Sequence, residues 1–187
     1  MKDKVLVVVD MQNDFINGSL GTSEAQQIVE NVAKKIRKHD GYILVTLDTH
    51  QDNYFETLEG KLLPVMHCLK YTDGWNLNED IRAALFGKEY YMIEKPTFGT
   101  SQIGSSIKMW AAKNLGSFDF EIEIVGLCSD ICVISNALLL RSEYPNVPIT
   151  VYEDCCAGVT PQKHEAAMSV MESCQITVKR SEQSDKG

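Results

Sequence analysis

A cysteine in the second half of the chain lies where a thiol could act as a nucleophile. Residues 120–125 are rich in β-branched side chains, which predicts a strand that Gly126 ends. From Asp130 onward apolar residues recur at helical spacing, and aspartate is a good helix N-cap. Cys132 is therefore expected in the first turn of a helix, where free N–H groups and the helix dipole favour a thiolate and could hold an oxyanion. Because a free cysteine is more often a small buried hydrophobe, this position needs support from other groups.

Further polar groups directly follow other predicted strands. They are Asp10 after residues 5–9, Asp48 and His50 after residues 42–47, and Lys95 after residues 90–93. Ligands of α/β proteins bind beyond the carboxyl ends of parallel strands, so these groups are expected to converge with Cys132. Taken singly, Asp10 would be interpreted as a helix N-cap or as part of a loop Asx turn, and Lys95 as a solvated surface lysine.

The segment Asp48-Thr49-His50, with a later His67, has the residue types of a metal site. One carboxylate and two imidazoles suit zinc, iron or manganese and leave positions for water or substrate. The alternative is that both histidines are ordinary loop residues. The long irregular segment 51–74 between the second and third strands contains several apolar side chains, so we expect it to be ordered.

Strands and helices alternate along the whole chain. Strands are predicted at 5–9, 42–47, 90–93, 120–125, 147–152 and 176–178, and helices at 23–39, 77–86, 105–114, 130–143 and 161–172. This alternation predicts an α/β fold, a single-domain doubly wound (Rossmann-like) parallel sheet with helices on both faces. The domain is expected to span residues 1–180, followed by a polar tail at 181–187. No GxGxxG or Walker loop is present, which removes the main support for a nucleotide cofactor.

Composition narrows the classes of partner and compartment. The 187 residues carry a formal net charge of −8 without a basic run, which argues against nucleic acid and anionic membranes. The chain enters a strand pattern after Met-Lys-Asp-Lys, so we expect no signal peptide and a cytoplasmic protein with reduced thiols. Four of the six cysteines are expected to be structural, and two histidines are expected on helix surfaces; they are Cys68, Cys155, Cys156, Cys174, His39 and His164.

Four segments in this order resemble the isochorismatase-like cysteine hydrolases and, within them, the nicotinamidases. The segments are Val9–Phe15, Asp48–His50, Glu94–Gly99 and Gly126–Val133. The resemblance implies that Asp10, Lys95 and Cys132 form a catalytic triad that hydrolyses an amide through a thioester. It further implies an oxyanion hole from the backbone N–H groups of Cys128 and Cys132, and a cis peptide bond between Leu127 and Cys128.

The same resemblance implies a metal site and a substrate contact. Glu59 is the best match for a fourth ligand beside Asp48, His50 and His67, with Glu56 and Asp52 as rivals. Zinc is the first expectation for this divalent ion, with iron or manganese as alternatives. Phe15 matches a residue that contacts the substrate ring. A homo-oligomer acting on a small-molecule amide is also implied.

One departure from the family pattern bears on the substrate. Several nicotinamidases carry a tryptophan shortly before the second metal histidine, whereas this chain has Leu-Pro-Val-Met at 63–66. Amidase chemistry is therefore better supported than nicotinamide as the substrate. The rivals are a related amidase acting on a ureido or carbamoyl compound and a non-catalytic protein on the same fold. An isochorismatase proper is less favoured, because hydrolysis of that vinyl ether does not need the cysteine.

Overall fold

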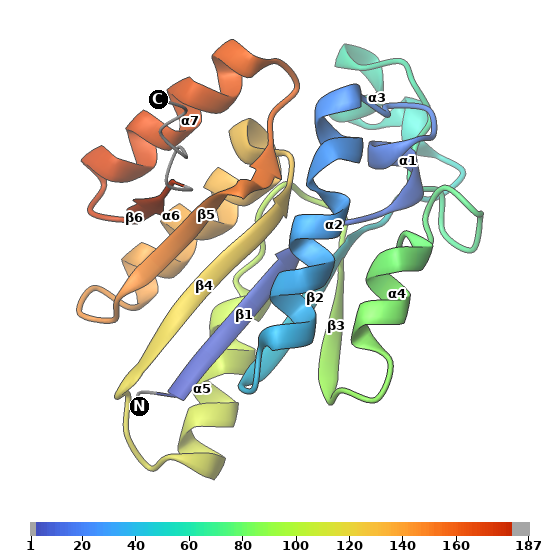
Figure 1. Ribbon diagram of the computed structural model, residues 1–187. Coiled ribbons are helices and arrows are strands. Elements are labelled where there is room, and N and C mark those ends of the chain that lie inside the picture. Colours follow the sequence, from blue (N-terminus) through green and yellow to red (C-terminus); the bar gives the residue numbers. More distant parts are fainter. Residues whose placement is uncertain (1–2, 181–187) are drawn as a thin grey trace, which may run out of the picture.

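Six parallel strands form one sheet in the order β3-β2-β1-β4-β5-β6 (Figure 1). The computed structural model describes residues 3–180, so the predicted tail at 181–187 lies outside the described residues. The strands are β1 (Asp3–Val9), β2 (Tyr42–Asp48), β3 (Tyr90–Lys95), β4 (Phe120–Leu127), β5 (Ile149–Ala157) and β6 (Thr177–Lys179). The predicted α/β fold with a doubly wound parallel sheet is confirmed.

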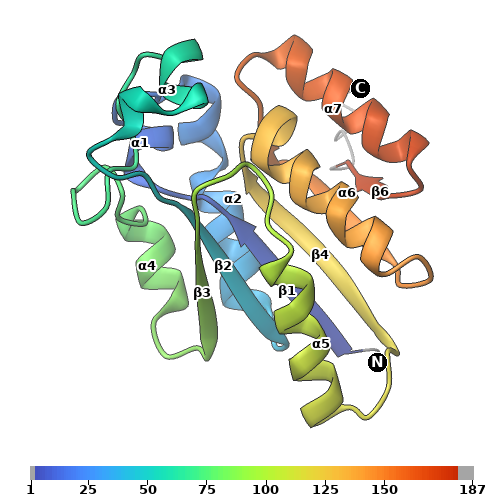
Figure 2. The same ribbon diagram turned by 180° about the vertical axis from the view of Figure 1, so that it is seen from behind.

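Helices cover both faces of this sheet. Those of seven residues or more are α2 (Ser23–Lys38), α4 (Glu79–Leu85), α5 (Gln102–Asn114), α6 (Ile134–Glu143) and α7 (Pro161–Ser173). In Figure 1, α2 and α4 lie in front of the sheet, and Figure 2 shows α5 and α6 on the opposite face. Alternate residues of β1 face the two layers: Val5, Val7 and Val9 join the core under α5, α6 and α7, whereas Leu6 and Val8 join the core under α2 and α4. Burial on both faces explains the unbroken apolar sequence of this strand.

The strand order reverses between β1 and β4, which creates a switch point at their carboxyl ends. At this point Gly126 pairs with Val9 and has a φ of +124°. A Cβ atom at Gly126 would lie 2.1 Å from the carbonyl oxygen of Val9, so only glycine lets the two strands approach this closely. The ends of β1 and β4 are thereby held together by direct backbone contact.

Local structure around the predicted nucleophile differs from the sequence prediction. The predicted helix 130–143 begins with a π-helical turn, Ser129–Val133, and α6 follows it. Asp130 does not cap this helix, because its carboxylate accepts a hydrogen bond from the N–H of Val159 at 3.0 Å. Cys132 nevertheless lies in the first turn after β4, as predicted.

The expectation for His39 was wrong. His39 is buried rather than on a helix surface, and its ring lies 3.5 Å from the carboxylate of Glu123. Elsewhere, Phe15 and Ile16 are buried in the one-turn helix α1 (Asn13–Ile16), and Thr22 caps α2 by accepting a hydrogen bond from the N–H of Ala25.

Glu123 of β4 is a buried carboxylate held by several donors. Lys4 and Lys35 pair with it at 3.0 and 2.9 Å, and the hydroxyl of Tyr152 donates to it at 2.7 Å. Burial alone would raise the pKa of this carboxyl, but the hydrogen bonds from His39, Lys35, Tyr152 and Lys4 together hold the pKa well below its ordinary range. Because the folded-state pKa is lowered, the stabilisation is present at neutral pH and is lost as the pH falls below about 4.

We therefore expect Glu123→Gln to lower the free energy of unfolding at pH 7 by about 3 kcal/mol, because it removes the buried anion that pairs with the partly exposed Lys4 and Lys35. The difference from the parent protein should shrink when urea unfolding is repeated near pH 3.5, where the Glu123 carboxyl of the unfolded chain gains a proton while that of the native protein is still ionised. Glu121→Gln, in the same strand, is the control and should change stability much less. A Glu123→Gln penalty that is equally large at both pH values would contradict this account.

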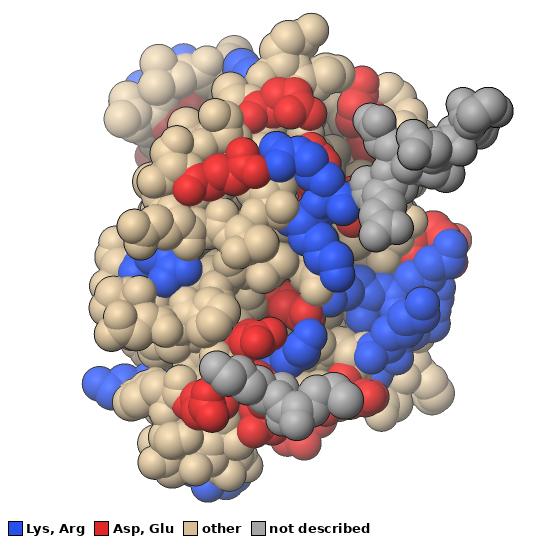
Figure 3. All heavy atoms as spheres, turned by 60° about the vertical axis from the view of Figure 1, so that its left-hand side comes forward, with Lys and Arg blue, Asp and Glu red and all other residues tan. Residues whose placement is uncertain are grey.

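Charges of both signs occur on the face of the molecule drawn in Figure 3. Basic side chains gather along one side of this face, and acidic side chains lie at the borders of that group. On this face, therefore, the charges of the two signs are not evenly mixed. Between residues 3 and 180, none of the helices has the length and apolar character needed to cross a membrane.

Candidate active site

Asp10, Lys95 and Cys132 meet at the switch point, although they come from three different strands. The ammonium nitrogen of Lys95 lies 2.6 Å from a carboxylate oxygen of Asp10 and 3.5 Å from the sulfur of Cys132. Asp10 and Lys95 are fully buried, and Cys132 is 5% exposed. Lys95 ends β3, two strands away from β1, so only a long side chain could cross β2 to reach Asp10. The lysine that sequence alone would place in solvent is thus a buried cation between a carboxylate and a thiol.

Asp10 is fixed by Thr46 of the neighbouring strand β2. The threonine hydroxyl donates to one carboxylate oxygen at 2.6 Å, and the backbone N–H of Asp10 donates to the Thr46 carbonyl at 3.2 Å. Asp10 has a φ of +48°, in the left-handed region that aspartate tolerates better than most residues. This backbone turn ends β1, while the hydroxyl of Thr46 leaves the second carboxylate oxygen for Lys95. Sequence analysis did not identify Thr46, because a threonine inside a strand carries no distinguishing signal.

Burial and neighbouring charges shift the pKa values of these groups. Burial, reinforced by the charge of Asp48, raises the pKa of Asp10 despite the nearby ammonium of Lys95. Burial also raises the pKa of the Cys132 thiol well above its ordinary value; Asp10 adds to this effect, and Lys95 opposes it. The expectation that the Cys132 thiol ionises easily was therefore wrong. Burial and the nearby carboxylates raise its pKa, and this effect outweighs the opposite effect of the helix dipole. A neutral thiol beside a carboxylate of raised pKa is suited to proton transfer during attack.

Beside the triad, Asp48, His50, Glu59 and His67 place their ligand atoms within 4.8 Å of one another. The Nε2 atom of His50 lies 3.1 Å from Asp48 and 3.7 Å from Glu59, and the Nε2 atom of His67 lies 3.5 Å and 3.6 Å from the same carboxylates. Nδ1 of His67 is 2.9 Å from the carbonyl of Val65, which orients the ring. Two imidazoles and two carboxylates fit a divalent transition metal such as zinc. Lys95 connects the two groups, because its nitrogen is 3.6 Å from Asp48.

A buried glutamine braces the metal-ligand candidate Asp48. The side-chain oxygen of Gln12 accepts from the N–H of Asp48 at 2.7 Å, and its amide nitrogen donates at 2.8 Å to the carbonyls of Asp48 and Trp75. The indole N–H of Trp75 donates to Thr49 at 2.9 Å, on the other side of the same loop. Gln12 lies in the first segment of the family resemblance, two residues after Asp10, and this position is the signal by which it could have been found.

The remaining predicted residues lie around these two groups. The Phe15 ring centroid is 5.6 Å from that of His67, so this side chain lies next to the cluster of two histidines and two carboxylates. The peptide bond between Leu127 and Cys128 is cis, as the resemblance implied. Among the rival carboxylates, Glu56 and Asp52 are exposed, whereas Glu59 on the five-residue α3 (Leu58–Leu62) joins the cluster.

Zinc binding can test which carboxylate completes the cluster of two histidines and two carboxylates. We expect Glu59→Gln to weaken zinc binding at least tenfold, because it removes one of the two anionic ligands. Glu56→Gln, three residues away and exposed, is the matched control and should bind zinc like the parent protein. Isothermal titration of the metal-free protein with zinc measures both affinities. Equal affinities for the two variants would show that Glu59 is not a ligand.

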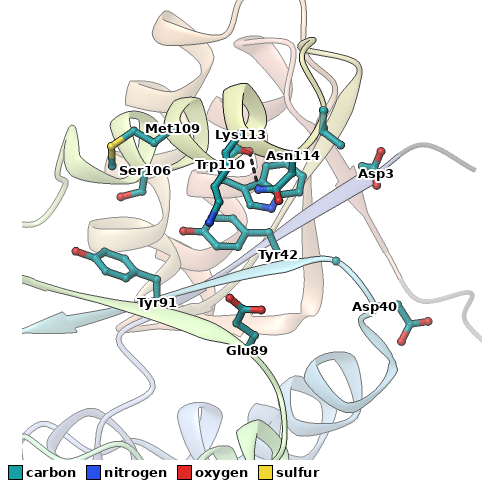
Figure 4. A pocket seen from close by; sticks show the side chains of 12 residues that line it. Asp3, Asp40, Tyr42, Glu89, Tyr91, Ser106, Met109, Trp110, Lys113 and Asn114 are labelled. Carbon is teal, nitrogen blue, oxygen red and sulfur yellow. Dashed lines mark hydrogen bonds between the residues drawn. The ribbon is translucent and has the colours of Figure 1, made fainter.

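A cavity of about 650 Å³ lies away from this site. It is lined by residues at the starts of β1, β2 and β3 and by residues of α5, at the edge of the sheet opposite the triad. Figure 4 shows Tyr42 and Trp110 together in it, and their rings stack with centroids 5.1 Å apart. None of the predicted site residues lines this cavity. The chemistry-bearing residues, rather than cavity size, locate the candidate active site.

The chain is similar to proteins that are named as amidases. The chain is 25% identical over 193 residues to the nicotinamidase/pyrazinamidase of Mycobacterium tuberculosis, covering 92% of this chain and 96% of that protein. A crystal structure of the pyrazinamidase of Pyrococcus horikoshii in complex with zinc superposes with a TM-score of 0.74 at 25% identity, over 96% of this chain and 99% of that one. The N-carbamoylsarcosine amidase of Thermoplasma acidophilum gives a TM-score of 0.72 at 28% identity, over 98% and 99% of the two chains.

Fold, site and relatives together define a hydrolase that acts on amide bonds. Residues 4–183 match the Isochorismatase domain, and the chain belongs to the isochorismatase family.

Proposed function

We propose that this protein hydrolyses nicotinamide to nicotinate and ammonia, with Cys132 as the nucleophile. The observation that carries the proposal is the direct contact between the triad and the candidate metal ligands. Lys95 contacts Asp10, Cys132 and Asp48, so the buried triad adjoins the cluster of two histidines and two carboxylates. A relative named for nicotinamidase and pyrazinamidase activity, aligned over nearly the whole chain, supports the choice of substrate.

The proposed reaction uses the residues of this chain in two half-reactions. The sulfur of Cys132 attacks the amide carbon while its proton passes to Asp10, whose raised pKa suits an acceptor. Asp10 returns the proton to the amide nitrogen as the C–N bond breaks, so ammonia leaves and a thioester remains. Water then attacks the thioester with Asp10 again accepting a proton, and the thiol of Cys132 is restored as nicotinate departs.

Developing negative charge must be stabilised during both attacks. The backbone N–H groups of Cys128 and Cys132 are the proposed oxyanion donors, and pre-oriented donors of this type contribute about 3–4 kcal/mol. The ammonium of Lys95 lies within 3.5 Å of the sulfur and favours the thiolate as it forms. This charge partly offsets the burial that raises the thiol pKa.

Asp48, His50, Glu59 and His67 are the proposed ligands of a divalent cation, with zinc first. When bound, such a cation would act as a Lewis acid toward the pyridine nitrogen of the substrate, which would help to orient the amide. Phe15 would pack against the ring, since it already lies beside His67. Orientation of this kind contributes several kcal/mol to a reaction barrier.

A second candidate is an amidase for small carbamoyl or ureido compounds. It is favoured by the similarity to an N-carbamoylsarcosine amidase and by the absence of a tryptophan in the segment before His67. This candidate uses the same triad, and it differs in needing no aromatic ring.

Substrate comparison separates these candidates. We expect ammonia release from nicotinamide to exceed that from benzamide at least 100-fold in kcat/KM, because benzamide lacks the ring nitrogen but has the same amide. N-carbamoyl amino acids are expected to be poorer than nicotinamide. Rates are measured with zinc, manganese or iron added. Equal turnover of benzamide and nicotinamide would overturn the pyridine assignment, and faster turnover of carbamoyl compounds would establish the second candidate.

A further inference from the structure

Asn136 is a buried amide one helical turn after the proposed nucleophile. It lies in α6 and is fully buried. Its nitrogen donates to the carbonyl of Cys132 at 2.8 Å and to the carbonyl of Phe98 at 3.2 Å, while its oxygen accepts from the N–H of Thr100 at 2.9 Å. One side chain therefore bonds both the turn that carries Cys132 and a segment far away in the sequence.

The bond to Cys132 acts on an irregular part of the backbone. Cys132 lies in the π-helical turn Ser129–Val133, where the N–H groups of both Ile131 and Val133 donate to the Cys128 carbonyl. Such turns interrupt the regular α-helical ladder and often occur at functional sites. The amide of Asn136 gives the Cys132 carbonyl a fixed donor and so fixes the orientation of the turn.

The other two bonds act on the segment that follows Lys95. Phe98 and Thr100 lie three and five residues after Lys95, between β3 and α5. In the same segment a Cβ atom at Gly99 would lie 2.8 Å from the Leu139 side chain, so this backbone packs directly on α6. The strand that carries Lys95 and the helix that follows Cys132 are therefore joined at Asn136.

We propose that Asn136 is a positioning residue that holds the Lys95 ammonium against the Cys132 sulfur. This inference deepens the proposed function, on which it rests, and assigns Asn136 no contact with substrate. Lys95 ends a strand three positions away in the sheet from the strand that precedes Cys132, and its nitrogen lies 3.5 Å from the sulfur, so a small displacement of either backbone breaks the contact. Without Asn136 nothing else among the described side-chain bonds ties residues 98–100 to the Cys132 turn.

The rate of Cys132 alkylation tests this proposal without any substrate. We expect Asn136→Leu, which has a similar size but no polar atoms, to react with iodoacetamide at least tenfold more slowly at Cys132 at pH 7.5, as followed by peptide mass spectrometry. The slower reaction follows from losing the Lys95 charge beside the sulfur. Asn136→Thr is the second variant, for the case that Asn136→Leu does not fold. Its hydroxyl can still donate to the carbonyl of Cys132, four residues earlier. We expect Cys132 in this variant to react at least threefold more slowly than in the parent protein.

Tyr144→Phe is the matched structural control. It removes a different buried hydrogen bond, from the Tyr144 hydroxyl to the Gly104 carbonyl at 2.6 Å, at the far end of α6. It should lower the melting temperature without slowing alkylation of Cys132. If Asn136 only stabilised the fold, its loss would loosen the turn and expose the thiol, so alkylation in Asn136→Leu that is unchanged or faster would overturn the proposal. Equal slowing in Tyr144→Phe would overturn it as well.

Turnover supplies the second measurement. If the proposed function holds, kcat of Asn136→Leu should fall at least tenfold with KM changed less than threefold, because substrate contacts stay in place. If the parent protein hydrolyses none of the amides tested, the proposed function fails, but the alkylation rates still decide whether Asn136 positions Cys132.

Discussion

Replacing Cys132 with alanine should abolish amide hydrolysis, while Cys128→Ala should retain most of it. Loss of a nucleophile removes the covalent route entirely, so we expect kcat to fall by at least about 10³-fold. The proposed role of Cys128 needs only its backbone N–H, which alanine keeps. Burial raises the pKa of both thiols, that of Cys128 to about 12, but the Lys95 ammonium lies 3.5 Å from the sulfur of Cys132. Ammonia release under saturating substrate measures both variants.

The pair forms its own control, because both cysteines lie at the same turn and both variants remove one sulfur atom. Circular dichroism and melting temperatures establish that both fold. Equal loss of activity in the two folded variants would mean that Cys132 is not the nucleophile.

Asp10→Asn should lower kcat by at least 100-fold, as expected when a general base is lost while size and shape are kept. The parent enzyme should also lose activity as the pH falls, because the base must be ionised to accept the thiol proton. Since the pKa of Asp10 is raised by burial, this loss should begin at a higher pH than for an ordinary aspartate. Profiles of kcat/KM against pH show whether activity falls on the acid side and at which pH the fall begins.

The residual activity of Asp10→Asn should no longer show this fall in activity at acid pH, which is the acid limb of the profile. Asp14→Asn, a change of the same chemistry four residues away in the same segment, is the control and should keep the acid limb of the parent. A full acid limb in Asp10→Asn would assign the titration to another group and remove the argument for Asp10 as the base.

Much of the fold and of the site residues' placement could be predicted because the signals are local. Unbroken apolar strands alternate with amphipathic helices, and the parallel topology then brings every strand end to one edge. Asp10, Lys95, Asp48 and His50 each lie at the carboxyl end of a strand or within two residues of it, so their convergence needed no knowledge of tertiary contacts. Their catalytic and metal-binding roles remain proposals.

What the sequence could not provide depends on distant neighbours. The thiol of Cys132 was expected to ionise easily from its place at a helix start, but burial and the carboxylate of Asp10 reverse the direction of its pKa shift. His39 follows a helix and looked exposed, yet it faces Glu123, which lies 84 positions further along the chain. Asn136 has an ordinary polar identity in an apolar helix, and only the packing of residues 98–100 gives it partners.

The close contact at Gly126 has a consequence for how this protein tolerates change. The separation between the base-bearing and the nucleophile-bearing strands is set by two backbones in contact, since a Cβ at Gly126 would meet the Val9 carbonyl at 2.1 Å. A residue with no side chain therefore governs the chemistry as strictly as one that reacts. In a library of random variants selected for activity, Gly126 would be as invariant as Asp10 or Cys132. A ranking of positions by their tolerance of substitution would therefore place Gly126 among the catalytic residues, although its proposed role is to set the distance between two strands.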